Sequence, residues 1–304
     1  MPCYYPLDGY RAKQPNDNGK YPLVFTRQEA QQDDPLRIPC GSCIGCRLEQ
    51  SRQWATRCVH ESTMWPDNSF ITLTYDDEHL PTNQSLDIIE WQSFMKALRQ
   101  QLHPKKIRFY AAGEYGKDQD PRTTRTIGRP HYHAIIFNHS FPRDEQIGKD
   151  LYRSDQLDSI WGKGFASVGA MTFESAAYVA RYCTKKITGE LAEQHYQVSN
   201  PETGEITNLK PEFSVMSRMP GIGRTWFDKY RKDLNKGYLT QDGNKMAIPK
   251  YYEKLLQKNH EQEYDTIKER KRAAIDPFDI EHSNNRLRAK EHYTNKRLLE
   301  RSLP

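Results

Sequence analysis

The chain of 304 residues lacks long apolar runs, and only 36% of its residues are hydrophobic. No stretch approaches the roughly 20 apolar residues that a bilayer-spanning helix needs, and no cleavable signal opens the chain. We therefore expect a soluble, cytoplasmic protein without a membrane partner. The sequence also has no internal repeat and no Walker phosphate loop of the form GxxxxGK[ST], so nothing in it suggests an ATP-driven motor.

Positive charge is only in mild excess, with 45 Lys and Arg against 40 Asp and Glu. This balance permits a polyanionic partner without requiring one. The aromatic content is more informative about function, because the chain has 18 Tyr, 11 Phe and 5 Trp. Such rings suit surfaces on which nucleic-acid bases stack, and they equally well supply the volume of a core.

Hydrophobic periodicity predicts an α+β fold. Strands are predicted at residues 70–75, 107–113, 131–137 and 165–173. Helices are predicted at residues 47–65, 85–102, 144–161 and 174–187, the second behind the cap candidates Ser85 and Asp87. From residue 70 the order is β-α-β-β-α-β followed by a helix, the ferredoxin-like pattern. That fold serves nucleic-acid modules and small enzymes alike, so function has to be inferred from the site.

The chain is predicted to divide into four segments. Residues 1–66 hold an irregular arm, up to residue 39, and a Cys-rich element, and residues 67–190 form the core. Residues 191–249 hold a hairpin across 195–215 and a short helix. Residues 250–304 are highly charged and are expected to form a tail of solvated helices.

Two histidines, His131 and His133, lie two residues apart at the start of a predicted strand, so both side chains project from one face. Alone, such a pair is as readily a surface coincidence as a metal site. If the neighbouring strands pair as a hairpin, Glu114 returns beside them; otherwise it is a solvent-exposed residue at a turn. Two imidazoles and one carboxylate suit Mn²⁺ or Mg²⁺ acting on phosphate, and the histidines favour Mn²⁺.

Tyr178 and Tyr182 are four residues apart on a predicted helix, so they lie on one face about 6 Å apart along the axis. Each is followed three residues later by a cation, Arg181 and Lys185, which could stabilise a phenolate or a phosphate. In isolation the pattern favours an amphipathic helix that packs Tyr rings against the sheet. Its combination with the His and Glu residues favours a nucleophile instead.

Three cysteines, Cys40, Cys43 and Cys46, lie within seven residues, a crowding that argues against a secreted disulfide framework. Three thiolates need a fourth ligand, which Cys3 or Cys58 could supply, and we predict a structural Zn²⁺ site. The spacing also matches part of an iron–sulfur pattern, although the usual fourth Cys and following Pro are missing. Unliganded thiols in a reducing cytoplasm are the third possibility.

With these residues the chain resembles the HUH endonucleases, and most closely the replication initiators of gokushovirus-type microviruses (Microviridae), small single-stranded DNA phages. The likeness rests on three ordered motifs: FITLTYDDEHLP at 70–81, GEYG at 113–116 with RPHYH at 129–133, and YVARYCTKK at 178–186. CGSCIGCR at 40–47 and EFSVMSRMPGIG at 212–223 also resemble this subgroup. The resemblance covers about residues 1–230.

The resemblance implies a rolling-circle replication initiator, which is a metal-dependent, site-specific nickase and strand-transferase acting on single-stranded DNA at the viral origin. His131, His133 and Glu114 would hold a divalent cation that polarises the scissile phosphate. A Tyr hydroxyl would attack phosphorus, leaving a free 3′-OH and a 5′-phosphotyrosine. The implied partners are the origin strand and a host helicase and polymerase, in the cytoplasm of the bacterial host.

Tyr178 and Tyr182 would then act in turn, one holding the old 5′ end while the other cuts the regenerated origin. The Tyr-x-x-Lys pattern favours Tyr182 as the first nucleophile, although the order is not readable from sequence. Because an unperturbed phenol has a pKa near ~10, deprotonation would need the metal or Lys185 and Lys186.

Four arginines are candidates for contacts to the DNA backbone; they are Arg47, Arg52, Arg129 and Arg181. Two alternative functions stay open. One is a non-enzymatic single-strand-binding module with a ferredoxin-like sheet, whose aromatic strand signature is not evident and which leaves the His and Glu residues unexplained. The other is a different HUH enzyme, such as a plasmid initiator, relaxase or transposase.

Overall fold

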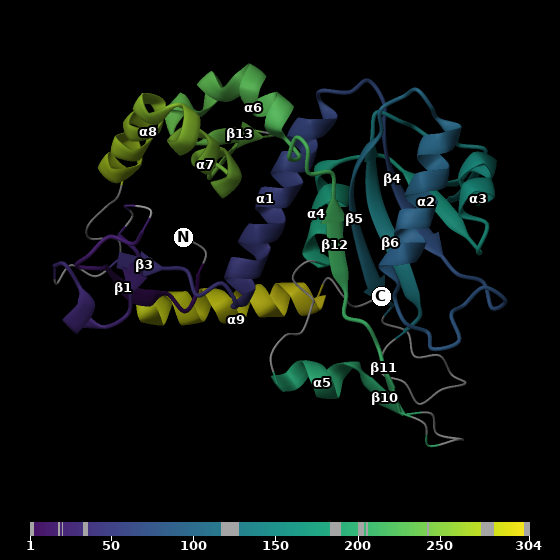
Figure 1. The fold of residues 1–304 in the computed structure, drawn as a ribbon, viewed down its shortest axis with the longest axis horizontal. Helices are drawn as coiled ribbons and strands as arrows, with labels where there is room; N and C mark the ends of the chain where they lie inside the picture. The colour runs from purple at the N-terminus through teal and green to yellow at the C-terminus, as the bar shows by residue number, and fades with distance from the viewer. Residues whose placement is uncertain are drawn as a thin grey trace. The chain divides into compact units, whose positions relative to one another are not determined.

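The computed structural model describes residues 3–17, 19, 21–32, 36–116, 128–182, 190–199, 204, 206–241, 243–274 and 283–300. The chain combines helices with antiparallel strands, which confirms the predicted α+β class (Figure 1). It divides into two compact units. Unit 1 comprises Met1–Gln50 and Ala273–Pro304, and unit 2 comprises Ser51–Arg272. The boundary between Gln50 and Ser51 falls within helix α1 (Ile44–Ser62).

A seven-stranded antiparallel sheet forms the centre of unit 2, in the order β12-β5-β6-β4-β9-β8-β7. Its strands are β4 (Asn68–Thr74), β5 (Arg108–Tyr115), β6 (Pro130–Phe137), β7 (Glu145–Gly148), β8 (Leu151–Arg153), β9 (Ala166–Gly169) and β12 (Phe213–Met216). The four predicted strands are present as β4, β5, β6 and β9. All alternate between the two faces of the sheet, which places one set of side chains in each of two cores.

One face of the sheet is covered by α2 (Ile88–Gln101) and α3 (Asp155–Trp161) (Figure 1). Trp91 of α2 and Trp161 of α3 both contact the ring of Tyr132 on β6. Even-numbered side chains of β6 therefore point into this core.

The opposite face is covered by α4 (Phe173–Tyr182) and by the part of α1 in unit 2. Val179 of α4 packs in one apolar cluster with Tyr110 of β5 and Ile135 of β6. Odd-numbered side chains of β6 point to this face, so His131 and His133 lie on the side of the sheet that carries α4.

The predicted helix over 144–161 is wrong in its first half, where β7 and β8 form an antiparallel hairpin. Only α3 is helical. Ile147 and Leu151 are four residues apart, a spacing that fits a helix face but also an edge hairpin with a tight turn. Asp150 in that turn has φ of 59°, a left-handed conformation that a continuous helix excludes.

Of the two predicted caps of α2, Asp87 is the N-cap, and its carboxylate accepts a hydrogen bond from the Ile89 N–H at 3.0 Å. The Ser85 hydroxyl instead accepts a hydrogen bond from the Lys210 N–H at 2.9 Å. Ser85 thus ties the start of α2 to the segment that leads into β12.

A third apolar cluster in unit 2 packs the helices that follow the sheet. Tyr252, Leu256 and Ile267 are buried in this cluster. The first part of the segment 250–304 is therefore helical, but it packs into a core instead of forming the solvated helices that the sequence predicts. The elements around this cluster are α6 (Arg224–Tyr230), η2 (Arg231–Lys236), β13 (Leu239–Gln241), β14 (Asn244–Met246), α7 (Lys250–Asn259) and α8 (Glu261–Ala273).

A hairpin precedes β12, as the sequence predicts. It consists of β10 (Gln197–Ser199) and β11 (Ile206–Asn208), which pair antiparallel, and it follows α5 (Glu190–Tyr196). β12 then leaves the hairpin and pairs with β5 of the main sheet.

Unit 1 holds a small antiparallel sheet where the sequence predicts an irregular arm. The order is β2-β1-β3, and the strands have only two to five residues, too few for a period to be recognisable. The strands are β1 (Leu7–Arg11), β2 (Leu23–Val24) and β3 (Leu36–Ile38). Unit 1 also contains η1 (Arg27–Glu29), the first turns of α1, and α9 (Asn284–Glu300).

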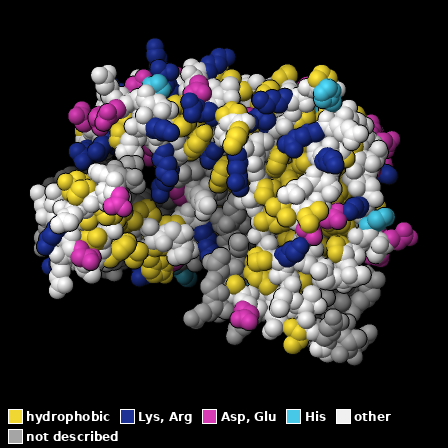
Figure 2. All heavy atoms as spheres, in the orientation of Figure 1, with side chains coloured by type: hydrophobic (Ala, Val, Ile, Leu, Met, Phe, Trp, Pro, Cys, Tyr) yellow, Lys and Arg dark blue, Asp and Glu magenta, His cyan; other side chains and the backbone are white. Residues whose placement is uncertain are grey.

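Lys and Arg side chains are scattered over the visible face of the protein, with hydrophobic and acidic side chains between them (Figure 2). Among the residues that the structure describes, no helix is long and apolar enough to cross a membrane.

Candidate active site

The pairing of β5 with β6 places Glu114 directly opposite His131. One oxygen of the carboxylate, Oε1, lies 2.7 Å from Nε2 of His131 and 3.0 Å from Nε2 of His133. Glu114 is 3% exposed, so it is not a solvent-exposed residue at a turn. The hairpin return that the sequence suggested therefore brings the three predicted ligands together, and we call them the triad.

The other ring nitrogen of each histidine has its own partner. His131 Nδ1 donates to the Arg129 carbonyl at 3.1 Å, and His133 Nδ1 lies 2.9 Å from the Thr72 hydroxyl. Since a carbonyl only accepts, the hydrogen of neutral His131 sits on Nδ1, and Nε2 turns a lone pair toward the Glu114 carboxylate. Two acceptors at that distance need a proton or a cation between them, and the partner on Nδ1 is typical of metal-binding histidines.

The donor atoms of the triad all lie within 4.8 Å of one another. Two imidazole nitrogens and one carboxylate oxygen form a donor set compatible with a divalent metal ion. The residues present thus fit a metal ion.

Tyr178 on α4 lies at the edge of the triad. Its ring centroid is 5.0 Å from that of His133, with the two planes at 82°. Phe70 of β4 contacts both rings, since it stacks on His133 at 5.9 Å and meets Tyr178 edge-on at 6.2 Å. Tyr178 is 40% exposed, so a ligand in solution can approach a phenol that is also packed against a triad histidine.

The remaining predicted catalytic residues are not placed beside the triad by the structure. Tyr182 is the last residue of α4, and its side chain lies outside the described part of the chain. Lys185 and Lys186 belong to residues 183–189, which also lie outside the described residues. Their roles stay predictions.

Thr72 and Phe70 are contacts of the triad that sequence reasoning missed. Thr72 pairs in register with His133 across β4 and β6, and Phe70 shares its face of the sheet. The period of two in β4 was the available signal, because it separates residues 70, 72 and 74 from the core-facing Ile71 and Leu73.

A cavity of about 320 Å³ adjoins the triad through Phe70, which lines it. Arg143 and Tyr152 line the same cavity, with the guanidinium 4.9 Å above the Tyr152 ring. Thr172 and Ser175, at the start of α4, close another side. Besides these residues the lining includes Lys149 and the two acidic residues Asp150 and Glu174, so the cavity carries charges of both signs.

The four arginines predicted to contact DNA differ in their surroundings. Arg129 is half-buried, with Nη1 2.8 Å from the Asp77 carboxylate and Nη2 donating to the Asp76 carbonyl. Arg181 is exposed on α4, whereas Arg47 and Arg52 are half-buried on α1. A contact of any of them with DNA stays a prediction.

The cysteine cluster lies in unit 1 and consists of Cys3, Cys40, Cys43 and Cys46, whose sulfur atoms are within 4.8 Å of one another. The Sγ atoms of Cys40 and Cys46 are 4.0 Å apart, as are those of Cys43 and Cys3. Four thiolates around one ion at the Zn–S length would lie about 3.8 Å apart, so the cluster fits a tetrahedral metal.

Hydrogen bonds around the cysteine cluster favour a thiolate at one position. Burial by itself would raise the pKa of the Cys40 thiol, but donors from Cys43 and Ser42 outweigh it and lower the pKa to about 6. Burial raises the pKa of Cys3 and of Cys46. Cys58, the alternative fourth ligand, is buried in the apolar cluster of unit 2 and is not in this group.

Comparison with known proteins gives consistent matches. Residues 68–187 match the family described as Replication-associated protein ORF2/G2P, and this range contains the triad and Tyr178. The chain is 34% identical to replication-associated protein VP4 of Bdellovibrio phage phiMH2K over 259 residues, which covers 80% of this chain and 75% of that protein.

Two further relatives have similar names. Identity to replication-associated protein ORF2 of Spiroplasma virus 4 is 33% over 256 residues, 77% of this chain and 72% of the relative. Identity to replication-associated protein ORF4 of Chlamydia phage 1 is 29% over 243 residues, 75% of this chain and 56% of the relative. No solved structure matches the chain.

Proposed function

Because the chain belongs to the family of replication-associated proteins, we propose that it initiates rolling-circle replication as a metal-dependent nickase and strand-transferase. The observation that carries the proposal is the contact of Tyr178 with His133, 5.0 Å between ring centroids, on the face of the sheet that holds Glu114. A phenol beside a set of metal ligands is what covalent phosphotyrosine chemistry requires.

The topology of unit 2 supports a ferredoxin-like HUH core. Elements β4, α2, β5, β6, α3 and β9 occur in this order as βαββαβ, with the β7–β8 hairpin inserted between β6 and α3. In the sheet the first and third of these strands, β4 and β6, lie in the middle of the order β5-β6-β4-β9. We infer that the chain is an HUH endonuclease similar to the initiators of gokushovirus-type microviruses.

His131, His133 and Glu114 would hold Mn²⁺ or Mg²⁺, and such an ion, when bound, polarises the scissile phosphate as a Lewis acid. The hydroxyl oxygen of Tyr178 or Tyr182 forms a bond to phosphorus as the bond to the 3′ oxygen breaks. The phenol gives up its proton and the departing 3′ oxygen takes one up. The products are a 3′-OH and a 5′-phosphate ester on the protein.

Two tyrosines on one helix allow the reaction to occur twice. Tyr178 keeps its ring beside His133, while Tyr182 follows one turn later on α4. While one tyrosine holds the 5′ end of the old strand, the other can cut the regenerated origin, and the released 3′-OH can reclose the first ester. Lys185 and Lys186 are proposed to assist the loss of the phenol proton.

The proposal includes partners and a second metal. The cysteine cluster would hold a structural Zn²⁺ with no open position for substrate. Because no Walker motif is present in the sequence, unwinding and synthesis fall to a host helicase and polymerase, in the bacterial cytoplasm. Arg47, Arg52, Arg129 and Arg181 are proposed to contact the backbone of the origin strand.

The test is formation of an adduct that survives SDS. Labelled single strands tiled over the genome that encodes the chain are incubated with the protein and Mn²⁺. We expect one strand to yield the adduct and a shortened product. His131→Ala and His133→Ala should each lower cleavage at least about 100-fold, because each removes a ligand from a three-ligand site.

His292→Ala provides the matched control, since it removes an exposed imidazole on α9. Its cleavage should equal that of the wild type, and binding of uncut strand should be similar in all three variants. Cleavage by either triad variant within a few-fold of the wild type would mean that the site is misassigned. Tight binding without any adduct would favour the non-enzymatic module.

A further inference from the structure

The cavity of about 320 Å³ beside the triad has its floor on the face of the sheet that carries α4. Phe70 of β4, Gly169 of β9 and Leu151 of β8 are direct cross-strand neighbours that all line it. A Cβ atom at Gly169 would stand 3.2 Å from Cδ1 of Phe70 and 3.4 Å from Cδ2 of Leu151. Because the Gly169 backbone is not left-handed, the missing side chain serves to leave space between its two neighbours.

Four exposed charged side chains surround this space, two of each sign. Among the described residues, the side chains of Lys149, Asp150 and Glu174 form no hydrogen bond or ion pair. Arg143 lies over the Tyr152 ring, a contact that uses a face of the guanidinium and leaves the N–H groups in its plane able to donate. A ligand therefore displaces water from these charges without breaking an ion pair within the protein.

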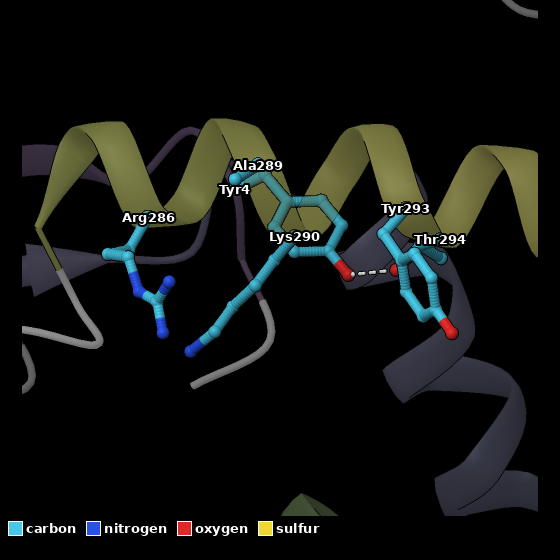
Figure 3. Close-up of a pocket in the computed structure, with 6 residues that line it drawn as sticks. All are labelled: Tyr4, Arg286, Ala289, Lys290, Tyr293 and Thr294. Carbon is cyan, nitrogen blue, oxygen red and sulfur yellow. Dashed lines mark hydrogen bonds between the residues drawn. The ribbon is translucent and has the colours of Figure 1, made fainter.

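A cavity of about 350 Å³ along α9 in unit 1 differs in this respect (Figure 3). Its cations, Arg286 and Lys290, already have interactions within the protein. The Tyr4 hydroxyl at the same cavity lies 2.8 Å from the Thr294 hydroxyl. Of these two cavities, the one beside the triad therefore has charged groups available to a ligand.

The position of the cavity relative to the candidate nucleophile indicates what the ligand is. Glu174 lies four residues before Tyr178 on α4, so their Cβ atoms are neighbours about 5–6 Å apart on the helix surface. Phe70 joins the two places, because it lines the cavity and contacts the rings of Tyr178 and His133. If the triad holds the phosphate that is cut, as the proposed function requires, an adjacent nucleotide of the same strand reaches the cavity.

The carboxylates select among the bases. A carboxylate only accepts hydrogen bonds, and it binds best to two parallel N–H donors. Guanine presents such a pair on its Watson–Crick edge, N1–H and the N2 amino group, and this edge is free in a single strand. Adenine and cytosine present one amino group beside a ring nitrogen that repels a carboxylate, and thymine presents one N–H between two carbonyls. Glu174 therefore favours guanine.

We propose that this cavity binds a guanine of the single strand, next to the phosphate that is cut. Glu174 accepts hydrogen bonds from N1–H and the N2 amino group, and Arg143 and Lys149 bind oxygens of a neighbouring phosphate. The inference deepens the proposed function and rests on it for the identity of the strand. It adds a sequence requirement to the nicking reaction.

The experiment measures binding of short labelled oligothymidylates to the full chain by fluorescence anisotropy, without divalent ions so that no cleavage occurs. One central position carries guanine, hypoxanthine, adenine or cytosine. The guanine strand should bind about tenfold more tightly than the adenine and cytosine strands, as for one bidentate base contact. The hypoxanthine strand, which keeps N1–H and lacks the N2 amino group, should lie between them.

Glu174→Gln tests the carboxylate. An amide offers one donor and one acceptor, which match adenine, so the preference for guanine should vanish or turn towards adenine. The matched control is Glu145→Gln, which removes an exposed carboxylate from β7 outside the cavity and should keep the preference. Lys149→Gln should weaken binding of all four strands alike and lower the slope of log Kd against log salt by about 0.7, for one lost phosphate contact.

Equal binding of the four strands by the wild type would overturn the inference, as would an unchanged preference in Glu174→Gln. Loss of the preference in Glu145→Gln as well would overturn it, because net charge and not one contact would then decide. Competition by free deoxyguanosine monophosphate as strong as that by the guanine strand would indicate a nucleotide site instead of a strand site. A guanine preference without any adduct in Mn²⁺ would contradict only the nicking proposal, and an adduct with equal binding would contradict only this inference.

Discussion

At the residue scale, a contact behind the triad orients one of its ligands. Thr72 lies 2.9 Å from His133 Nδ1 and so fixes the orientation of the ring. Thr72→Val keeps the shape and removes the hydroxyl, and we expect the affinity for Mn²⁺ to fall about tenfold or more. Calorimetric titration of Mn²⁺ into the protein measures this directly.

Thr74→Val is the control for that variant. The Thr74 hydroxyl is on the same strand and donates to the Phe165 carbonyl, with no bond to a histidine. Its Mn²⁺ affinity should be unchanged. Equal affinities of all three proteins would show that the Thr72 hydroxyl does not position the ligand.

The two tyrosines are separable by substitution. Tyr178→Phe and Tyr182→Phe should each retain first-strand cleavage at a reduced rate but lose release of closed circles, because one nucleophile cannot be both occupied and attacking. Only the double variant should form no adduct. Peptide mapping of the adduct identifies the residue that carries DNA. If one single variant released circles at the wild-type rate, that tyrosine would be a packing residue.

At the element scale, a histidine in α1 makes stability depend on pH. The His60 ring stacks on Trp226 at 3.6 Å, its Nδ1 lies 3.0 Å from the Tyr252 hydroxyl, and burial lowers its pKa to about 3. The unfolded chain binds the proton near pH 6.5 and the folded chain does not. The free energy of unfolding is therefore unaffected by this group above about pH 6.5, and it falls by about 1.4 kcal/mol per pH unit below that pH.

Urea unfolding at pH 7, 6 and 5 measures this loss. His60→Phe retains a ring between its neighbours but cannot take up a proton, so its stability should fall less steeply with acid than that of the wild type. The difference between the two slopes isolates His60 from other titrating groups. Parallel slopes would show that His60 takes up its proton at the same pH in the folded and the unfolded chain.

The elements also show what sequence can predict and why. Periodicity predicts β4, β5, β6 and β9, because a half-buried strand repeats every two residues. It fails for Ile147 and Leu151, whose spacing is common to a helix and a hairpin, and for the very short strands of unit 1.

The site divides in the same way. Side chains two residues apart on a strand share a face, so the sequence alone places His131 and His133 together. The antiparallel pairing of β5 with β6 brings Glu114 to them. Thr72 and Phe70 are in the site only because β4 pairs with β6 across more than fifty residues of chain. The contact of Tyr178 with His133 depends on how α4 docks on the sheet, which spacing along the helix does not encode.

At the scale of the whole molecule, the cysteine cluster predicts a metal content. Elemental analysis should find about one zinc per chain in addition to any ion at the triad. Removal of that zinc with a chelator should expose residues 36–50 to proteases while unit 2 stays resistant, because the ligands lie in unit 1. A brown, iron-containing sample would overturn the choice of zinc, and absence of both metals would indicate free thiols.

Unit 1 is assembled from both ends of the chain, with Tyr4 bonded to Thr294 and Tyr5 to Glu291. During translation the first fifty residues leave the ribosome long before α9 has been made. The N-terminal cysteines therefore spend most of the synthesis time without the helix that completes their unit. A nascent chain that stops before residue 284 carries every residue of the triad and yet lacks α9, so a truncated product keeps these residues but has an incomplete unit 1.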